Sequence, residues 1–336
     1  MGDLLIRADA DEFMGTGHVM RCLALAQAWQ DAGAGTASLA SIVLPPGIRA
    51  RFEREGVRVL SVGGGGEALS QAVRESGASW TVLDGYQFGA EEQQAVTGSS
   101  GRLLVVDDFG AVGHYVGDMI VDPNVLAGEL AYARRPPGTR LLLGPTYALL
   151  RRELRSGPAP STVARGGRRV LLTFGGADRC GLSLLALEAL GAADIEVTVV
   201  VGPANPRRSA VQAAAEGHAN VRVVSDAADM RDLIDGADMA VTAAGGTCME
   251  LAYRGVPQIV VVTARNQRHV AEGLAQRGAA STLGEGADLT ADRMRDAVLT
   301  LLGDGPERLR LRDAGMQLVD GNGADRVIAA MREVAA

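Results

Sequence analysis

The sequence predicts an α/β protein built from two doubly wound domains with mainly parallel sheets. Short apolar runs of strand length alternate with amphipathic runs of helix length along nearly the whole chain, as is typical of parallel sheets covered by helices. Residues 155–168, rich in proline, glycine, serine and arginine, interrupt this alternation, which then starts again. We therefore expect one domain on each side of a linker.

The bulk composition limits the classes of protein to consider. A chain of 336 residues, 47% of them hydrophobic, can fill two cores. The net charge of −7 offers no basic surface for a nucleic acid, and no apolar run is long enough to cross a membrane. The amino terminus runs directly into LLIRADAD without a signal-peptide pattern. We expect a cytoplasmic monomer that binds neither nucleic acid nor membrane.

The reactive side chains exclude several kinds of chemistry. Every basic residue is arginine, so a Schiff-base lysine, a pyridoxal-phosphate lysine and a Walker A lysine are all absent. Cys22, Cys180 and Cys248 are too far apart in sequence for a C-x-x-C pair, and the four histidines show no metal-ligand spacing. We expect three free thiols, no metal and no cofactor.

The first domain begins with an apolar run from Leu4 to Ile6, which predicts a short buried strand. A loop with glycines follows, and residues at helical spacing then predict a helix that begins at His18. Further strands are predicted at residues 37–43, 57–60, 80–86, 103–108 and 119–124, with helices over 69–76 and 91–96. The glycines at 63–66 suit either a phosphate cradle or a surface turn.

The second domain repeats this pattern. It starts with a strand from Val170 to Phe174, a Gly175-Gly176 turn and a helix, and IEVTVVVG, NVRVVSD and QIVVV predict further strands. A final apolar helix from Ala324 to Val334 follows the turn DGNG. The expected boundaries are 1–154 for the first domain, 155–168 for the linker, 169–320 for the second domain and 321–336 for the last segment.

His18 is the candidate catalytic residue. It lies in G-T-G-H-V-M-R, in the first loop between a strand and a helix, and such loops face the ligand in open α/β sheets. A histidine there can act as a base, and Gly15 and Gly17 let the loop turn tightly. The alternative is a helix cap or a histidine bonded within the fold. The pattern lacks the third glycine of the dinucleotide fingerprint.

Two glycine turns in the second half predict a nucleotide site. Each turn precedes a helix, whose free N–H groups and dipole suit a diphosphate without lysine or metal. A carboxylate one turn further on can accept hydrogen bonds from a ribose diol. The candidate nucleotide-binding residues are Gly175, Gly176, Asp178, Gly245, Gly246, Thr247 and Glu250. The alternative for either glycine pair is a tight turn with no ligand.

Carboxylates follow several predicted strands in the first half. The D-x-D pair of Asp9 and Asp11 resembles that of metal-dependent sugar transferases, but we expect Asp9 to bond its loop or a sugar hydroxyl. Other polar residues after strands could line a sugar pocket or cap helices: Asp84, Tyr86, Asp107, Asp108 and Asn124.

A series of motifs gives the chain a family resemblance. They are IRADADEFMGTGHVMRCLALA, LDGY, VVDD, VDPN, LLGPTYALLRREL, TFGGADRCGLS, AAGGTCMELAYRGVPQIVVV, ARNQ and DGNGADRV. Together they resemble the UDP-sugar hydrolases of pseudaminic acid biosynthesis, which cleave UDP-2,4-diacetamido-2,4,6-trideoxy-β-L-altropyranose. The resemblance covers nearly the whole chain. It implies a fold like the two-domain GT-B glycosyltransferases, with a cleft between the domains, a nucleotide-binding second domain and a last helix returning to the first.

The resemblance also implies roles for individual residues. His18 would be the catalytic histidine, and Glu250 and the turn at 245–247 would bind the nucleotide. The implied substrate-binding residues, together with those proposed above from their loops, are Asp9, Gly15, Gly17, Arg21, Tyr86, Asn266 and Gln267. The chain departs from the family at Asp11 and Glu12, where small polar residues are common, and at Gly246, where serine is common.

The expected reaction is hydrolysis of a UDP-linked sugar. His18 would remove a proton from water as the water attacks the anomeric carbon, with inversion and without a metal. One alternative is a glycosyltransferase that uses an acceptor hydroxyl in place of water. A second alternative is a protein that binds nucleotide sugars without turnover.

Overall fold

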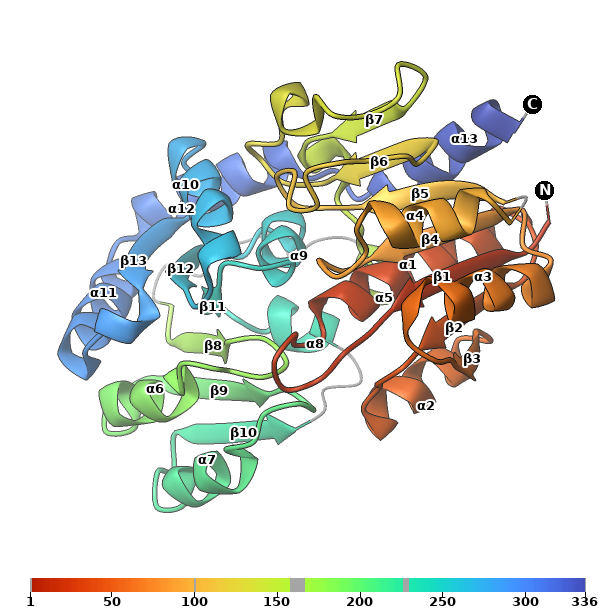
Figure 1. The fold of residues 1–336 in the computed structure, drawn as a ribbon. Coiled ribbons are helices and arrows are strands. Elements are labelled where there is room, and N and C mark those ends of the chain that lie inside the picture. The colour runs from red at the N-terminus through yellow and green to blue at the C-terminus, as the bar shows by residue number, and fades with distance from the viewer. Residues whose placement is uncertain (1, 100, 158–166, 226–229, 336) are drawn as a thin grey trace. The chain divides into compact units, whose positions relative to one another are not determined.

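The computed structural model describes residues 2–99, 101–157, 167–225 and 230–335 (Figure 1). The chain groups into two compact units. The first comprises residues 1–11, 18–152 and 321–336, and the second comprises residues 12–17 and 153–320.

The first unit contains a sheet of seven parallel strands in the order β3-β2-β1-β4-β5-β6-β7. The strands are β1 Leu4–Ala8, β2 Ala37–Ser41, β3 Arg58–Ser61, β4 Trp80–Asp84, β5 Arg102–Val106, β6 Met119–Asp122 and β7 Arg140–Leu143. The order reverses between β1 and β4, so the chain winds in both directions from β1. Ligands of open α/β sheets bind at such a reversal, outside the carboxyl ends of the strands.

Helices cover both faces of this sheet. They are α1 Gly17–Asp31, α2 Pro46–Arg54, α3 Gly65–Ser76, α4 Ala90–Thr97 and α13 Gly323–Ala335, with short 3₁₀ turns η1 Glu129–Tyr132 and η2 Pro145–Tyr147. The short helix α5 Arg152–Arg155 lies where the second unit begins, and its Leu154 is buried in a core of that unit. Leu4 and Ile6 of β1 share a core with α1 and α13, whereas Leu5 shares a core with α3 and α4. This alternation follows from the two-residue period of a strand, and it explains why β1 is apolar throughout.

The last helix, α13, belongs to the core of the first unit. Val327, Ile328 and Met331 are buried there with residues of α1. Gly323 begins the helix, and a side chain at this position would collide with the backbone of Ala148. The chain therefore comes back to its first unit through a close backbone approach that glycine permits.

The second unit contains six parallel strands in the order β10-β9-β8-β11-β12-β13. They are β8 Arg169–Thr173, β9 Glu196–Val201, β10 Val221–Ser225, β11 Met239–Ala243, β12 Gln258–Val262 and β13 Ser281–Glu285. The helices are α6 Leu182–Leu190, α7 Arg208–Ala215, α8 Met230–Asp235, α9 Thr247–Arg254, α10 Arg268–Gln276, α11 Ala291–Gly303 and α12 Gly305–Leu318, with turns η3 Arg265–Gln267 and η4 Gly286–Asp288. The prediction of two doubly wound α/β domains is confirmed.

Some details differ from the sequence prediction or lie outside the described residues. Gly65 and Gly66 belong to the start of α3, so only part of the four-glycine stretch is a loop. Most of the predicted linker, residues 158–166, is outside the part that the structure describes. Within the described ranges, no helix has the length and apolar character needed to cross a membrane.

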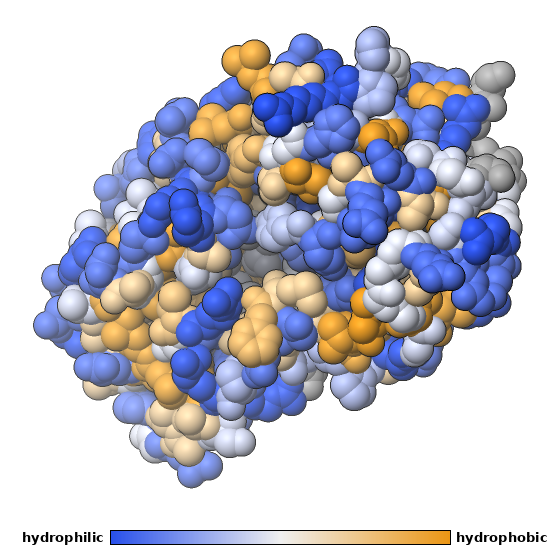
Figure 2. All heavy atoms as spheres, viewed as in Figure 1, coloured by the Kyte–Doolittle hydropathy of each residue, from blue (hydrophilic) through white to orange (hydrophobic). Residues whose placement is uncertain are grey.

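The surface mixes polar and apolar residues. Figure 2 shows one face, on which hydrophobic residues gather in small groups among hydrophilic ones. Large exposed apolar side chains are found at Phe13, Ile42, Val43 and Leu130. Scattered apolar residues of this kind are ordinary on a folded protein.

Candidate active site

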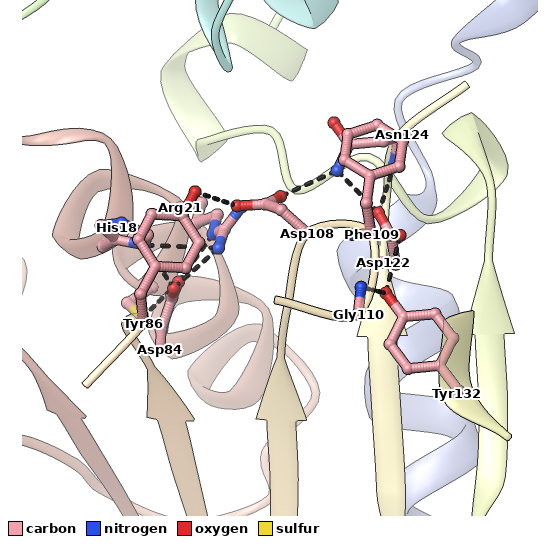
Figure 3. A network of polar contacts seen from close by, with 11 residues as sticks. His18, Arg21, Asp84, Tyr86, Asp108, Phe109, Gly110, Asp122, Asn124 and Tyr132 are labelled. Atoms are coloured by element: carbon pink, nitrogen blue, oxygen red, sulfur yellow. Dashed lines mark hydrogen bonds and ion pairs between the residues drawn. The ribbon is translucent and has the colours of Figure 1, made fainter. Parts of the chain in front are cut away.

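His18 and Asp84 form a close pair at the carboxyl ends of two neighbouring strands. His18 follows β1 at the start of α1, and Asp84 is the last residue of β4. His18 Nδ1 lies 2.6 Å from Asp84 Oδ1 (Figure 3). The Asp84 side chain is fully buried and that of His18 is 11% exposed. The pair is held within the fold, with the imidazole at its outer side.

The hydrogen-bond geometry assigns the proton of the neutral imidazole. Nδ1 donates to the Asp84 carboxylate, because an ionised carboxylate is only an acceptor. Arg21 Nη2 lies 3.3 Å from the same nitrogen, a longer contact that does not compete with the 2.6 Å bond. Nε2 therefore carries the lone pair, and within the described ranges it has no hydrogen-bond partner. A histidine in this state can accept a proton.

Arg21 connects Asp84 to a second carboxylate. Its Nε and Nη2 donate to the two oxygens of Asp84, each at 2.7 Å, and its Nη1 donates to Asp108 Oδ1 at 2.9 Å. Burial works to raise the pKa of both carboxyls, but the Arg21 guanidinium outweighs it and both pKa values lie below the ordinary one. Both carboxylates are therefore charged at neutral pH.

Tyr86 and Asn124 complete the surroundings of Asp108. The Tyr86 hydroxyl donates to Asp108 Oδ2 at 2.8 Å, and Asn124 Nδ2 donates to Asp108 Oδ1 at 2.8 Å. The Tyr86 ring also meets the His18 ring edge to face, with 5.0 Å between the centroids. Figure 3 shows these side chains converging from the ends of β4, β5 and β6.

Two carboxyl–phenol pairs lie beneath this edge of the sheet. Tyr132 donates to Asp122 at 2.7 Å, and Tyr115 donates to Asp107. Burial raises the pKa of both Asp107 and Asp122, although the phenol bonds oppose this shift. Because all four groups are buried and bonded to one another, they support the loops of the site.

The loop after β1 is fixed by Asp9. Its Oδ1 accepts from Ile42 N at 2.7 Å and from Ser41 Oγ at 2.9 Å, and Arg7 Nη1 lies 2.7 Å away. Asp9 thus joins the loops after β1 and β2, and contact with a sugar stays a prediction for it. Gly15 has a φ of +75°, which glycine adopts without strain. No cluster of His, Cys, Asp and Glu among the described residues could hold a metal ion.

The two predicted glycine turns of the second unit differ at their helix ends. The N–H groups of Leu182 and Ser183, at the start of α6, donate to the Asp178 carboxylate at 2.8 and 2.9 Å. Asp178 is buried, with a φ of +43°. A diphosphate would have to displace this carboxylate. The helix that follows the Gly175-Gly176 turn is therefore already capped by a side chain of this protein.

The turn before α9 is open. The cap residue of this helix is Gly246, which has no side chain, and a Cβ placed on Gly245 or Gly246 would meet no atom within 4 Å. The N–H groups of Cys248 and Met249 donate to the carbonyls of Gly245 and Gly246, each at 3.0 Å. Thr247 is the first residue of α9, and Glu250 lies half-buried in its first turn. The α9 amino end offers an anion both N–H groups and the positive end of the helix dipole.

Asn266 and Gln267 form part of η3 after β12. The Gln267 Oε1 accepts from the backbone N of Thr263 at 2.8 Å and from its hydroxyl at 3.0 Å, so this amide holds the turn. Asn266 is exposed. Both residues follow the carboxyl end of β12. The glycine turn before α9 follows the carboxyl end of β11 in the same way.

Comparison with known proteins shows where the chain belongs. A sequence model described as the glycosyltransferase family 28 C-terminal domain matches residues 175–317. A UDP-N-acetylglucosamine–N-acetylmuramyl-(pentapeptide) pyrophosphoryl-undecaprenol N-acetylglucosamine transferase of Sorangium cellulosum is 31% identical over 315 residues, 89% of this chain and 70% of that protein. The chain belongs to glycosyltransferase family 28.

Two other relatives have lower sequence identity to this family 28 protein, and both matches cover a smaller share of this chain. The spore coat polysaccharide biosynthesis protein SpsG of Bacillus subtilis is 29% identical over 58% of this chain, and the match spans only 59% of that protein. The UDP-2,4-diacetamido-2,4,6-trideoxy-β-L-altropyranose hydrolase of Campylobacter jejuni is 20% identical over 82% of this chain and 97% of its own length. The family named by the sequence resemblance is thus a distant relative.

Solved structures share the fold of the family 28 protein. MurG of Acinetobacter baumannii superposes with a TM-score of 0.68 at 15% identity, over 99% of both chains. The S. aureus MnaA structure with UDP superposes with a TM-score of 0.70 at 11% identity, over 100% of this chain and 97% of that one. The GT-B glycosyltransferase-like fold expected from the resemblance is confirmed.

The sequence prediction missed the partner of His18. The sequence pattern predicts Asp84 and Asp108 as pocket or capping residues and connects neither of them to the histidine or to Arg21. A usable sign was present, because both carboxylates follow apolar runs that predict strands of a parallel sheet. The order of those strands, which places β4 next to β1, was the missing information.

Proposed function

We propose that this family 28 protein cleaves the anomeric C–O bond of a UDP-linked diacetamido-trideoxy sugar, with water as the nucleophile and His18 as the general base. The observation that carries the proposal is the 2.6 Å bond between His18 Nδ1 and the buried Asp84. Similarity to the Campylobacter hydrolase along 97% of that protein's length supports the choice of substrate class.

The proposed reaction uses the two ring nitrogens in different ways. Nε2 of His18 takes a proton from water as the water oxygen forms a bond to the anomeric carbon. The bond to the UDP oxygen breaks, the electron pair leaves with UDP, and the anomeric centre inverts. Asp84 keeps Nδ1 protonated and stabilises the imidazolium that forms. The proposal needs no metal ion.

We assign the diphosphate of UDP to the amino end of α9. Among the described residues, the N–H groups of Gly246 and Thr247 at this end make no hydrogen bond, whereas those at the start of α6 donate to Asp178. Helix amino ends stabilise the negative charge that develops on a departing diphosphate. Glu250, one turn into the helix, is the candidate partner of the ribose diol.

A second function has specific support. The family 28 sequence model and the Sorangium transferase favour transfer of the sugar to an acceptor hydroxyl. The same base would serve, since His18 would then remove the proton of the acceptor instead of a water proton.

One experiment separates the two functions. The protein is incubated with a UDP-linked diacetamido-trideoxy sugar, and separately with UDP-N-acetylglucosamine, without any acceptor. Chromatography measures UDP, and NMR of the anomeric proton identifies the free sugar and its configuration. Hydrolysis predicts equal amounts of UDP and free sugar. UDP release only after an acceptor hydroxyl is added would support the transferase and reject the hydrolase.

The role of His18 is tested in the same assay. General base catalysis contributes about 10²–10⁴-fold, so His18→Ala should lower kcat by that factor. UDP affinity, measured by calorimetry, should stay nearly unchanged. His269→Ala is the matched control, because its side chain is 58% exposed on α10. If UDP affinity and turnover fall together in His18→Ala, His18 is a structural residue.

A metal requirement is tested by chelation. We expect turnover to be unchanged in excess EDTA. Loss of turnover with EDTA that magnesium restores would contradict the metal-independent mechanism.

A further inference from the structure

Asp108 has every one of its oxygens occupied by this chain's own side chains. Oδ1 accepts from Arg21 Nη1 and Asn124 Nδ2, and Oδ2 accepts from the Tyr86 hydroxyl. The donors come from α1, from the loop after β4 and from the loop after β6. A carboxylate engaged in this way is poorly placed to bind substrate, but it fixes three neighbours at once.

Two of those neighbours touch the His18–Asp84 pair. Arg21 is bidentate to Asp84, and the Tyr86 ring lies against the His18 ring. Asp108 therefore contacts the base only through other residues. It accepts a hydrogen bond from Nη1 of Arg21, so that Nε and Nη2 stay directed at Asp84. It also accepts a hydrogen bond from the Tyr86 hydroxyl (Figure 3).

The charges around the imidazole add a second effect. Asp84 and Asp108 are negative and Arg21 is positive, so the cluster carries one net negative charge beside neutral His18. The other groups that face it are the Tyr86 phenol and the Cys22 thiol, which donates to Asp84 at 3.4 Å. Behind Asn124 lies Asp122, bonded to Tyr132. A protonated His18 would bring the net charge of the cluster to zero. The negative charge of Asp108 is part of this balance.

We propose that Asp108 is a positioning residue of this site, which holds Arg21 against Asp84 and adds a negative charge to the cluster around His18. This inference rests on the proposed function of His18 as a base. Arg21 is the connecting element: it compensates both carboxylates and keeps them apart from each other. The site thus depends on a second carboxylate that never touches the reacting atoms.

The test replaces the charge and keeps the shape. In Asp108→Asn the side chain can still accept from Arg21 and Asn124, but the negative charge is gone. Asp118→Asn is the matched control, because Asp118 is also a carboxylate bonded within the first unit, to Leu103 N at 2.7 Å, but at the amino end of β6. Arg21→Lys keeps the positive charge and loses the bidentate geometry.

The pH profile of kcat/KM is the first measurement. Removing a nearby negative charge favours neutral imidazole, so the acidic limb should move to lower pH by about half a unit or more in Asp108→Asn. The plateau kcat should fall at least about tenfold with little change in KM, because the base is weaker and less well held. Arg21→Lys should lower kcat without this downward shift of the limb. Asp118→Asn should match the parent.

An independent measurement does not need turnover. The ring signals of His18, identified by their loss in His18→Gln, are followed by NMR against pH. In Asp108→Asn they should titrate at lower pH than in the parent, by the same half unit or more. This holds even if UDP-sugar cleavage is never seen, so failure of the proposed function can be told apart from failure of this inference.

Two results would overturn the inference. One is an unshifted His18 titration in a folded Asp108→Asn protein, with folding checked by thermal unfolding. The other is an equal shift in Asp118→Asn, which would mean that the effect reflects net charge alone. If Asp108→Asn does not fold, an unchanged kcat in Arg21→Lys would overturn the positioning role.

Discussion

At the scale of single residues, the hydrogen bond from His18 to Asp84 does more than orient a ring. It fixes which nitrogen carries the proton, and therefore which nitrogen can accept one. Arg21 offsets the cost of burying the Asp84 charge with two further bonds. The imidazole, the carboxylate and the guanidinium thus work as one unit, and removal of any member should affect the others.

Asp84→Asn should lower kcat by about 10²–10⁴-fold, because an amide can no longer hold Nδ1 in its protonated form. UDP affinity should change little. The measurement is single-turnover kinetics together with UDP calorimetry. A kcat within threefold of the parent would show that Asp84 does not set the tautomer.

Asp84 should also affect stability as a function of pH. Its pKa in the folded chain lies below the ordinary value of 3.8, chiefly because Arg21 and His18 outweigh the opposing effect of burial. The stability that the charged form supplies is therefore present above pH 3.8 and is lost as the pH falls through the lower folded value. Asp107 and Asp122, whose pKa values are raised, oppose this trend in the whole protein.

A comparison of variants isolates the contribution of Asp84. The difference in unfolding midpoint between the parent and Asp84→Asn should be largest near pH 6 and should shrink as the pH falls from 5 to 3. A difference that stays constant over this range would contradict the charge effect and leave only a packing effect.

At the scale of elements, two helices with similar glycine turns have different amino ends. Asp178 caps α6 with its own carboxylate, whereas the residue at the cap position of α9 is Gly246, which has no side chain. Cys248 and Met249 donate to the carbonyls of Gly245 and Gly246, so the N–H groups of Gly246 and Thr247 are the donors left for water or a ligand at this end. The difference makes α9 the better candidate for binding a diphosphate.

Gly246→Asp tests this assignment. Gly246 has a φ of −57°, and a Cβ there meets no atom within 4 Å, so the substitution fits without strain. A carboxylate at this helix end should leave stability unchanged or raise it by about 0.3–1 kcal/mol. It should weaken UDP binding at least tenfold by repulsion. Unchanged UDP affinity would place the diphosphate elsewhere.

Gly246→Ala is the matched control for that test. It adds a Cβ without charge, and both the unfolding midpoint and the UDP affinity should stay close to those of the parent. Thermal unfolding and calorimetry on the three proteins give the complete comparison.

At the scale of the whole molecule, the chain folds into two units with separate cores, and the first is completed by the last helix. Met331 of α13 is fully buried among residues of α1, while Leu311 of α12 is buried in the core of the second unit. Twenty residues of sequence separate two side chains that stabilise different units. Destabilising one unit should therefore leave the other largely unaffected.

Scanning calorimetry checks this division. Met331→Ala and Leu311→Ala should each cost about 2–5 kcal/mol, since both remove a buried side chain from a packed core. Met331→Ala should lower the unfolding transition of the first unit, and Leu311→Ala that of the second. Equal lowering of a single shared transition by both variants would show that the two cores unfold together.

The fold class could be read from the sequence, which also places the candidate base in the first loop. Apolar runs of four to six residues alternating with helical periodicity predict parallel sheets, because burial on both faces requires exactly this local pattern in each strand. The His18 loop was identified from residue types and spacing, which are local. The strand bounds were close as well, for instance 103–108 predicted against Arg102–Val106.

The tertiary structure alone decided which groups meet. His18 and Asp84 are 66 residues apart and pair only because β4 lies beside β1. The start of α6 is capped because Asp178 directs its carboxylate at the N–H of Ser183. The last helix, α13, belongs to the first core because it packs against α1. Local patterns reflect the burial of each segment by itself, whereas these contacts arise from the order in which segments assemble, which no short stretch of sequence specifies.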